Sequence, residues 1–224
     1  MSLTDYKEPL AAIAAFCTIL QFLAGVPVCR KFFKSGTVGD TSAFPFIAGF
    51  LSCSLWLRYG YLLGDKSVIV TNVVGAFLQF SYVICYTAYS SRKTSVLRLF
   101  LVICFVLLLV ITYMQYMPDN ETAKTHLGFI CCCVTIVFFA APFANLAHVI
   151  KVKSAESLPF AMIVANLIVS AEWMTYGIII DDAYVEITNA LGCILSGIQL
   201  SLFLKYPSTP SKDLVSNLFT NTLV

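Results

Sequence analysis

Long apolar stretches separated by short polar breaks run through the whole chain of 224 residues. A helix needs ~20 mostly apolar residues to cross a bilayer, and seven stretches reach that length. They are expected at Leu10–Cys29, Phe44–Leu63, Val68–Tyr89, Val96–Met117, Leu127–Ile150, Phe160–Ile180 and Ala183–Leu204. The pattern predicts an all-α integral membrane protein with seven transmembrane helices.

The composition agrees with this prediction, because 59 % of the residues are hydrophobic and only 12 % are charged. Soluble domains carry roughly 25 % charged residues, so this chain has too little polar surface to remain in water. The net charge of +2 gives no sign of a nucleic-acid partner. Membrane lipid is the expected surrounding.

Basic residues mark one side of the membrane. They gather in the first, third and fifth breaks and after the last span: Arg30, Lys31, Lys34, Arg92, Lys93, Lys151, Lys153, Lys205 and Lys212. Most acids lie in the opposite breaks. Because basic loops stay in the cytosol, the N-terminus is expected outside and the C-terminus inside. The polar tail, residues 207–224, is predicted to be disordered.

The two tryptophans of the chain, Trp56 and Trp173, begin two copies of one pattern. Each is followed by x-x-Tyr-Gly and, sixteen residues after the tryptophan, by Asn-x-x-Gly, which places Asn72 and Asn189 at matching positions. An acid follows each tryptophan after nine residues. A pattern repeated in this way predicts two structural repeats that share one site.

The two repeats are expected to be parallel, since both place a basic first loop on the cytosolic side. This requires an odd number of spans between them, which the unmatched fourth span supplies. The organisation is therefore a first triple-helix repeat over residues 1–90, a linker helix and outer loop over 91–125, a second triple-helix repeat over 126–206, and the tail. The predicted architecture is 3+1+3.

Four prolines complete the repeated pattern. Pro27 and Pro142 lie inside apolar stretches, where proline kinks a helix. Pro45 and Pro159 each precede a phenylalanine at the start of the second span of a repeat, where proline is tolerated at low cost. For the second pair, a hinge and a plain helix start are equally good interpretations.

Taken together, these motifs resemble the SWEET sugar transporters (MtN3/saliva repeats), in particular the animal saliva-type members, over roughly residues 22 to 206. The resemblance implies a facilitative, bidirectional sugar uniporter whose two triple-helix bundles rock about a central pocket. It further implies that the first and third helices of a bundle pack together. The resemblance also implies a homo-oligomer, namely a trimer.

The resemblance also assigns roles to individual residues. It implies that sugar binds to Trp56, Asn72, Trp173 and Asn189. It places the cytosolic hinges of the inner gate at Pro27, Pro45, Pro142 and Pro159. It places the outer gate at Tyr59 and Asp182. Tryptophan at both pocket positions leaves less room than many plant members have, which disfavours a disaccharide.

The residue types themselves suit a neutral polyol. An indole stacks on the apolar C–H face of a pyranose, and an asparagine amide offers a donor and an acceptor to neighbouring hydroxyls. The alternatives are an interfacial aromatic belt for Trp56 and Trp173 and interhelical hydrogen bonds for Asn72 and Asn189.

Other features add little chemistry. The nine cysteines fall in apolar stretches without a CxxC pair and, with two histidines lacking ligand-like spacing, predict neither a metal site nor a cofactor. No catalytic constellation is found, so an enzyme is not expected. Asn120 begins a glycosylation sequon, Asn-Glu-Thr, on the outer side. Arg58 and Glu172 are ionisable residues within spans, which draws attention to them.

Two other functions remain open. The first is a proton-coupled carrier of a small neutral solute, for which Glu172 is the deep carboxylate available. The second, less favoured, is a seven-helix receptor. The plasma membrane is the expected location, with the Golgi membrane as the alternative.

Overall fold

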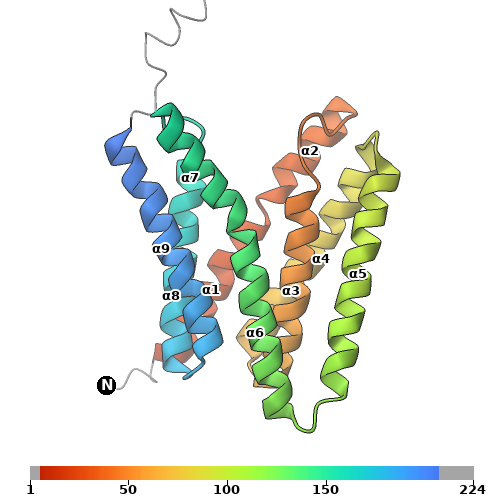
Figure 1. Ribbon diagram of the computed structural model, residues 1–224, viewed down its shortest axis with the longest axis vertical. Helices are drawn as coiled ribbons and strands as arrows, with labels where there is room; N and C mark the ends of the chain where they lie inside the picture. Colours follow the sequence, from red (N-terminus) through yellow and green to blue (C-terminus); the bar gives the residue numbers. More distant parts are fainter. Residues whose placement is uncertain (1–5, 207–224) are drawn as a thin grey trace, which may run out of the picture. The chain divides into compact units, whose positions relative to one another are not determined.

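The computed structural model describes residues 6–206, and within this range every regular element is a helix (Figure 1). The helices are α1 Lys7–Phe22, α2 Gly25–Ser35, α3 Phe44–Leu63, α4 Lys66–Tyr89, α5 Lys93–Gln115, α6 Asn120–Phe138, α7 Ala140–Val152, α8 Phe160–Ile179 and α9 Ala183–Lys205. Seven of the described segments are long and apolar enough to cross a membrane, with α1 and α2 counted as one. The prediction of seven spans is confirmed. The tail that was predicted to be disordered lies outside the described residues.

The chain divides into two compact units, one ending at Thr135 and the other beginning at Ile136. The first contains α1 to α5 and most of α6, and the second contains α7, α8 and α9. This division by contacts falls inside the fifth predicted span. The repeat boundary at residue 126 was inferred from sequence and stays a prediction.

Two of the seven spans expected as single helices are interrupted. The first breaks between α1 and α2, and the fifth breaks between α6 and α7. Pro27 and Pro142 each occupy the third position of the helix that follows the break. Proline has no N–H, and its ring collides with the carbonyl four residues earlier. At the first break, Val26 N–H instead donates to the Leu23 carbonyl at 2.9 Å, which tightens the turn.

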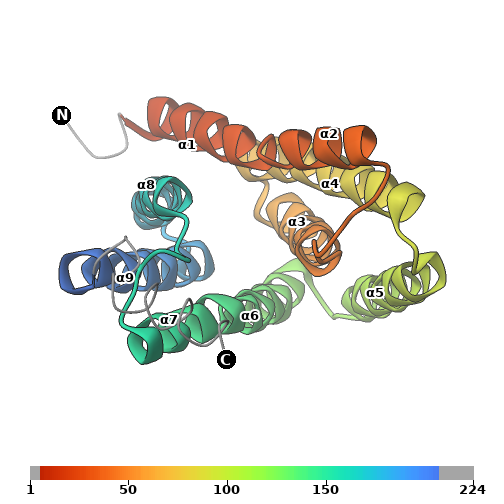
Figure 2. The same ribbon diagram turned by 90° about the horizontal axis from the view of Figure 1, so that it is seen from above.

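In the first unit, α4 is the central helix. Both α1 and α2 lie along it, and α3 and α5 also pack against it (Figure 2). The contact of the first and third helices of the repeat, implied by the family resemblance, is therefore confirmed here. A core of Phe32, Phe46, Tyr82 and Tyr86, among others, fills the end of the unit near α2.

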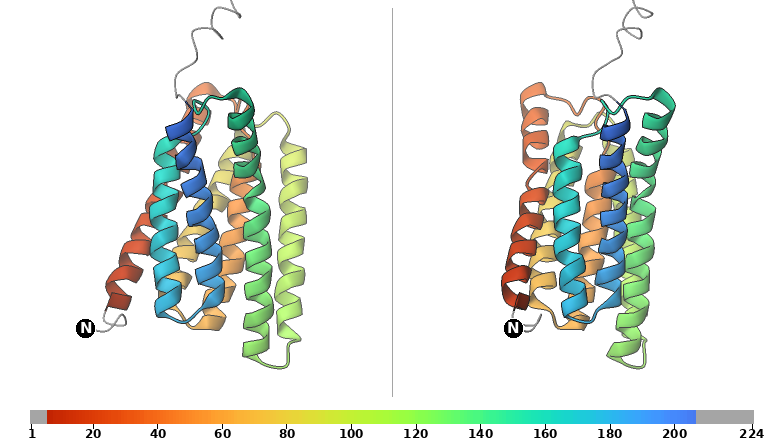
Figure 3. Two further views of the ribbon diagram at one scale, coloured as in Figure 1. Left: turned by 60° about the vertical axis from the view of Figure 1, so that its left-hand side comes forward. Right: turned by 90° about the vertical axis from the view of Figure 1, so that its left-hand side faces the viewer.

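In the second unit, α8 and α9 form a hairpin and lie side by side, and α7 packs against α9 (Figure 3). The core of this unit is aliphatic and includes Leu146, Val149, Ile163 and Leu202. Many large apolar side chains elsewhere remain exposed, such as Phe77 at 69 % and Ile194 at 60 %. Exposed apolar surface on helices of this length is typical of an integral membrane protein.

The backbone repeats at the turns as well. Gly36 ends α2 with φ +70°, and Lys153 ends α7 with φ +54°. Gly64 ends α3 with φ +72°, and Asp181 adopts φ +55° between α8 and α9. A left-handed residue closes a helix by satisfying its last carbonyls. Lysine and aspartate adopt a positive φ less readily than glycine. The two repeats therefore share the left-handed backbone at these turns although the residue types differ.

Candidate functional site

Each tryptophan of the repeated motif meets the tyrosine three residues after it. The rings of Trp56 and Tyr59 lie 5.3 Å apart at 79°, and those of Trp173 and Tyr176 lie 5.5 Å apart at 87°. Edge-to-face pairs of this kind are favourable beyond their buried area. Tyr59 and Tyr176 are 0 % and 1 % exposed. A fully buried tyrosine therefore supports the indole in both units, including Tyr59, which was expected at the outer gate.

Each asparagine of the motif is oriented by its own helix. Asn72 Nδ2 donates to the Val68 carbonyl at 2.8 Å, and Asn189 Nδ2 donates to the Val185 carbonyl at the same distance. This bond assigns the amide orientation. It leaves each amide oxygen and the second N–H to face outward from the helix, and both residues are half-buried. Each repeat thus holds one amide N–H donor and one amide oxygen acceptor in a fixed orientation.

Close contacts between α3 and α4 place Trp56 and Asn72 at one level of the first unit. A Cβ added to Gly60 would lie 2.8 Å from Val68 Cγ1, and one added to Gly75 would lie 2.6 Å from Cys53 Sγ. Trp56 comes midway between Gly60 and Cys53, and Asn72 comes midway between Val68 and Gly75. Because the helices are antiparallel, the two side chains share a level.

The second unit repeats this arrangement. A Cβ on Gly177 would meet the Glu186 backbone nitrogen at 2.6 Å, and one on Gly192 would meet Ser170 Oγ at 2.5 Å. These contacts bracket Trp173 and Asn189 as before. The glycines of Trp-x-x-Tyr-Gly and Asn-x-x-Gly are therefore the points where the two helices of each hairpin touch.

The repeated acids cap helices. Asp65 accepts hydrogen bonds from Ser67 N and Val68 N, each at 3.0 Å, and Asp182 accepts one from Val185 N at 2.9 Å. A carboxylate at this position satisfies backbone donors that the first turn leaves unpaired. Asp182 was assigned to an outer gate, and the structure gives it this capping contact.

The prolines differ in position. Pro27 and Pro142 follow the two helix breaks, as expected for kinks. Pro45 lies in the first turn of α3, and Pro159 immediately precedes α8. Both therefore serve as helix starts, and their role as hinges stays a prediction.

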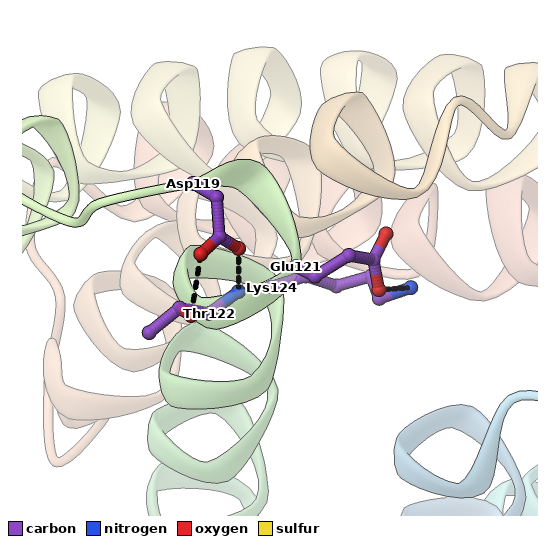
Figure 4. Close-up of polar contacts among 4 residues, drawn as sticks. All are labelled: Asp119, Glu121, Thr122 and Lys124. Atoms are coloured by element: carbon purple, nitrogen blue, oxygen red, sulfur yellow. Dashed lines mark hydrogen bonds and ion pairs between the residues drawn. The ribbon is translucent and has the colours of Figure 1, made fainter.

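The sequon lies elsewhere than expected. Asn120 was placed in an outer loop, but it is the first residue of α6. Asp119 explains the early start, because its carboxylate accepts from Thr122 N at 2.8 Å and from Thr122 Oγ1 at 3.0 Å (Figure 4). These bonds lower the pKa of Asp119. An ion pair of 2.7 Å between Lys124 and Glu121 follows in the same turn.

Two tyrosines of α4 were not found from the sequence. The Tyr82 hydroxyl donates to the Phe22 carbonyl at 2.9 Å, and the Tyr86 hydroxyl donates to the Thr41 carbonyl at 2.8 Å. These two hydrogen bonds connect α4 to the break between α1 and α2 and to the loop before α3. Both positions differ in the second repeat, which has Gln199 and Phe203, so the repeat could not reveal them. Gly25 makes room for the Tyr82 ring, because a Cβ there would collide with it.

Within residues 6–206, no group of histidine, cysteine, aspartate or glutamate side chains could hold a metal ion. The nine cysteines are all free thiols. Glu172 lies half-buried on α8, directly before Trp173, and Arg58 stacks over the Tyr61 ring at 5.4 Å.

Comparison with known proteins identifies the family. A family model described as "Sugar efflux transporter for intercellular exchange" (MtN3/saliva) matches residues 8–94 and again 125–211. The sugar transporter SWEET1 of Drosophila pseudoobscura pseudoobscura is 43 % identical over 209 residues, which cover 92 % of each chain. Human sugar transporter SWEET1 is 35 % identical over 197 residues, covering 88 % of this chain and 89 % of the human one.

A solved structure is also similar. The 3.7 Å structure of a eukaryotic SWEET transporter matches with a TM-score of 0.84 and 25 % identity, and the match covers 93 % of this chain and all of that one. With the two matched repeats and these relatives, the chain belongs to the MtN3/saliva family of SWEET transporters.

Proposed function

We propose that this protein carries small neutral sugars across a membrane, down their gradient and in both directions. The observation that carries the proposal is that a tryptophan and an asparagine lie at one level of each unit, with the same internal geometry in both. We call this the Trp–Asn level; it consists of Trp56 and Asn72 in the first unit and of Trp173 and Asn189 in the second. The relatives are named sugar transporters, and a transport role in place of an enzymatic one is part of the proposal.

The proposed sugar contacts are Trp56 and Asn72 in the first repeat and Trp173 and Asn189 in the second. The indoles would stack on the C–H faces of the sugar ring. The amide oxygens and free N–H groups would bond to neighbouring hydroxyls. The supporting evidence is that each indole is braced by a buried tyrosine and each amide by a backbone carbonyl. Such bracing reduces the ordering cost of binding.

The proposed movement is alternating access by the two triple-helix repeats. The breaks before Pro27 and Pro142 support hinges there, since a broken helix bends without losing further backbone hydrogen bonds. Pro45 and Pro159 are proposed to complete the inner gate, and Tyr59 and Asp182 the outer one. Placement in the plasma membrane or the Golgi membrane, an outside N-terminus, a cytosolic C-terminus and a homotrimer belong to the same proposal.

A proton-coupled carrier is the second candidate, and Glu172 favours it. This carboxylate lies within the α8 span next to Trp173, where an ionisable group is costly and often functional. It has no counterpart in the first repeat, where Leu55 precedes Trp56. Because the two Trp–Asn levels match and the carboxylate is unmatched, passive transport is the better-supported proposal.

The decisive experiment is uptake of radiolabelled glucose by proteoliposomes containing the purified protein. Asn72→Ala and Asn189→Ala should each reduce uptake by roughly 5- to 150-fold while the protein stays folded, because unpaired polar groups in such a site cost ~1–3 kcal/mol. Asn120→Gln is the matched control, since it changes an exposed amide far along the chain from both motifs. Normal uptake by both alanine variants would exclude this site.

A further inference from the structure

A second polar side chain lies on the face of α4 that carries Asn72. Gln79 follows Asn72 by seven residues, which is two helical turns, so it lies on the same face ~10 Å further from the Asp65 end. The α3–α4 register continues to this point. Gly49 faces Gln79 as Trp56 faces Asn72, and a Cβ on Gly49 would lie 2.7 Å from Gln79 Cδ.

The amide of Gln79 is incompletely satisfied. Its Oε1 is buried and has no hydrogen-bond partner among the described residues. Leaving a buried acceptor unpaired costs more than removing it altogether. Glycine at position 49 makes the space that the amide occupies. The chain thus keeps a polar group, and room for it, at a site where its own atoms offer no partner.

Packing of the helices does not require this amide. The residues next to Gly49 and Gln79 are Phe50 and Phe80, and together with Phe100 of α5 they form a cluster of three rings. The ring centroids are separated by 5.3 to 5.9 Å. These rings supply the apolar contact among α3, α4 and α5 at this level. An apolar side chain in place of Gln79 would serve that contact equally well.

We propose that Gln79 Oε1 accepts a hydrogen bond from a sugar hydroxyl at a second contact level, two turns from the Trp56–Asn72 level. The inference rests on the proposed sugar transport. A carbonyl acceptor selects ligands that donate, and the hydroxyls of a neutral polyol fit this requirement. In the second repeat, the residues at the same register are Asn166 and Ser196, so polar side chains occupy this level there too.

The test compares Gln79→Met with the wild type in glucose transport and in thermal unfolding. Methionine keeps the length and flexibility of glutamine, but its thioether sulfur is a much weaker hydrogen-bond acceptor than an amide oxygen. Loss of one such bond should raise KM about fivefold. The melting temperature should stay unchanged or rise, because an unpaired buried acceptor is removed. Thr71→Val is the matched control. Thr71 also lies on α4, and its Oγ1 is also buried with no hydrogen-bond partner among the described residues. Its KM should not change.

Two further measurements make the assignment specific. Gly49→Ala should displace the Gln79 amide and raise KM in the same direction. In a panel of deoxyglucose isomers, one isomer should show the same KM with wild type and with Gln79→Met, because it lacks the hydroxyl that Gln79 would bind.

The outcomes separate two failures. If wild-type protein carries no sugar, the proposed function is wrong. If wild type carries glucose and Gln79→Met does so with unchanged KM, the amide holds only a buried water or nothing, and this inference is overturned. A parallel fall in melting temperature and transport in Gln79→Met would likewise overturn it, because that result indicates a purely structural side chain.

Discussion

The hydroxyl of Tyr82 on α4 donates to the carbonyl of Phe22, the last residue of α1, at 2.9 Å. In a continuous helix this carbonyl would accept from Val26 N–H, but that donor bonds to Leu23 instead. The Tyr82 ring also lies against Gly25, directly after the break. A side chain from the third helix of the repeat therefore completes the broken first helix.

Tyr82→Phe should lower the free energy of unfolding by ~0.5–1.5 kcal/mol, because it removes this hydrogen bond but keeps the ring. Thermal unfolding in detergent measures the change. Tyr116→Phe is the control, since Tyr116 is 81 % exposed and should lose nothing. Equal stability of the two variants would show that the Tyr82 hydroxyl does not support the break.

Gly177→Ala should destabilise the protein by ~1–3 kcal/mol, because the added methyl group meets the Glu186 backbone nitrogen at 2.6 Å and backbone cannot move aside cheaply. Gly197→Ala, on α9 with nothing within 4 Å of the new atom, should instead stabilise by up to ~1 kcal/mol. Both are read by thermal unfolding. A stabilised Gly177→Ala would contradict the close approach of α8 and α9.

Variants of Asp182 separate helix capping from a charged gate. Asp182→Asn keeps a capping acceptor for Val185 N and should retain stability, whereas Asp182→Ala should lose ~1 kcal/mol. Glucose uptake is then measured for the asparagine variant. Full uptake assigns the residue to capping, and lost uptake with normal stability assigns its charge to the outer gate.

Trp56→Ala should raise the ratio of disaccharide to hexose uptake, because removal of the indole enlarges the proposed site on one side. The measurement is competition between radiolabelled glucose and sucrose in proteoliposomes. Leu57→Ala, one residue along the same helix, controls for general loosening of α3. Retained uptake with an unchanged ratio would show that the indole does not limit substrate size.

Passive transport predicts that an imposed pH gradient does not concentrate sugar. A coupling ion must bind the two access states with different affinity, and Glu172 is the carboxylate positioned for that role. Counterflow and efflux are measured with and without the gradient, for wild type and for Glu172→Gln. Proton-driven accumulation that disappears in Glu172→Gln would replace the uniporter with a proton-coupled carrier.

Sequence reasoning succeeded where one physical rule dominates. Span lengths follow from bilayer thickness, so α3 is Phe44–Leu63 as predicted. The kinks followed from the missing N–H of Pro27 and Pro142. The spacing of Trp56 and Asn72 was visible in the sequence, but the close contact at Gly60 and Gly75 that places them at one level needed coordinates.

Other features could not be inferred because they join distant segments or depend on a local competition. Tyr82 and Phe22 are sixty residues apart, and no local pattern pairs a hydroxyl with a particular carbonyl. The early start of α6 depends on the Asp119 carboxylate, whose hydrogen bonds to Thr122 cap the helix although the stretch that follows is polar. Gln79 lies in an apolar run, and its unpaired oxygen becomes apparent only once Gly49 is placed opposite.

The pairing of Tyr82 with Phe22 also constrains the order in which the protein can mature. During synthesis α1 emerges before α4, so the side chain that completes it arrives two spans later. Until then the Phe22 carbonyl lacks both the Val26 N–H of a continuous helix and the Tyr82 hydroxyl, and an unpaired carbonyl is unfavourable in hydrocarbon. The first span is therefore made before α4 but reaches its final form only once α4 is in place.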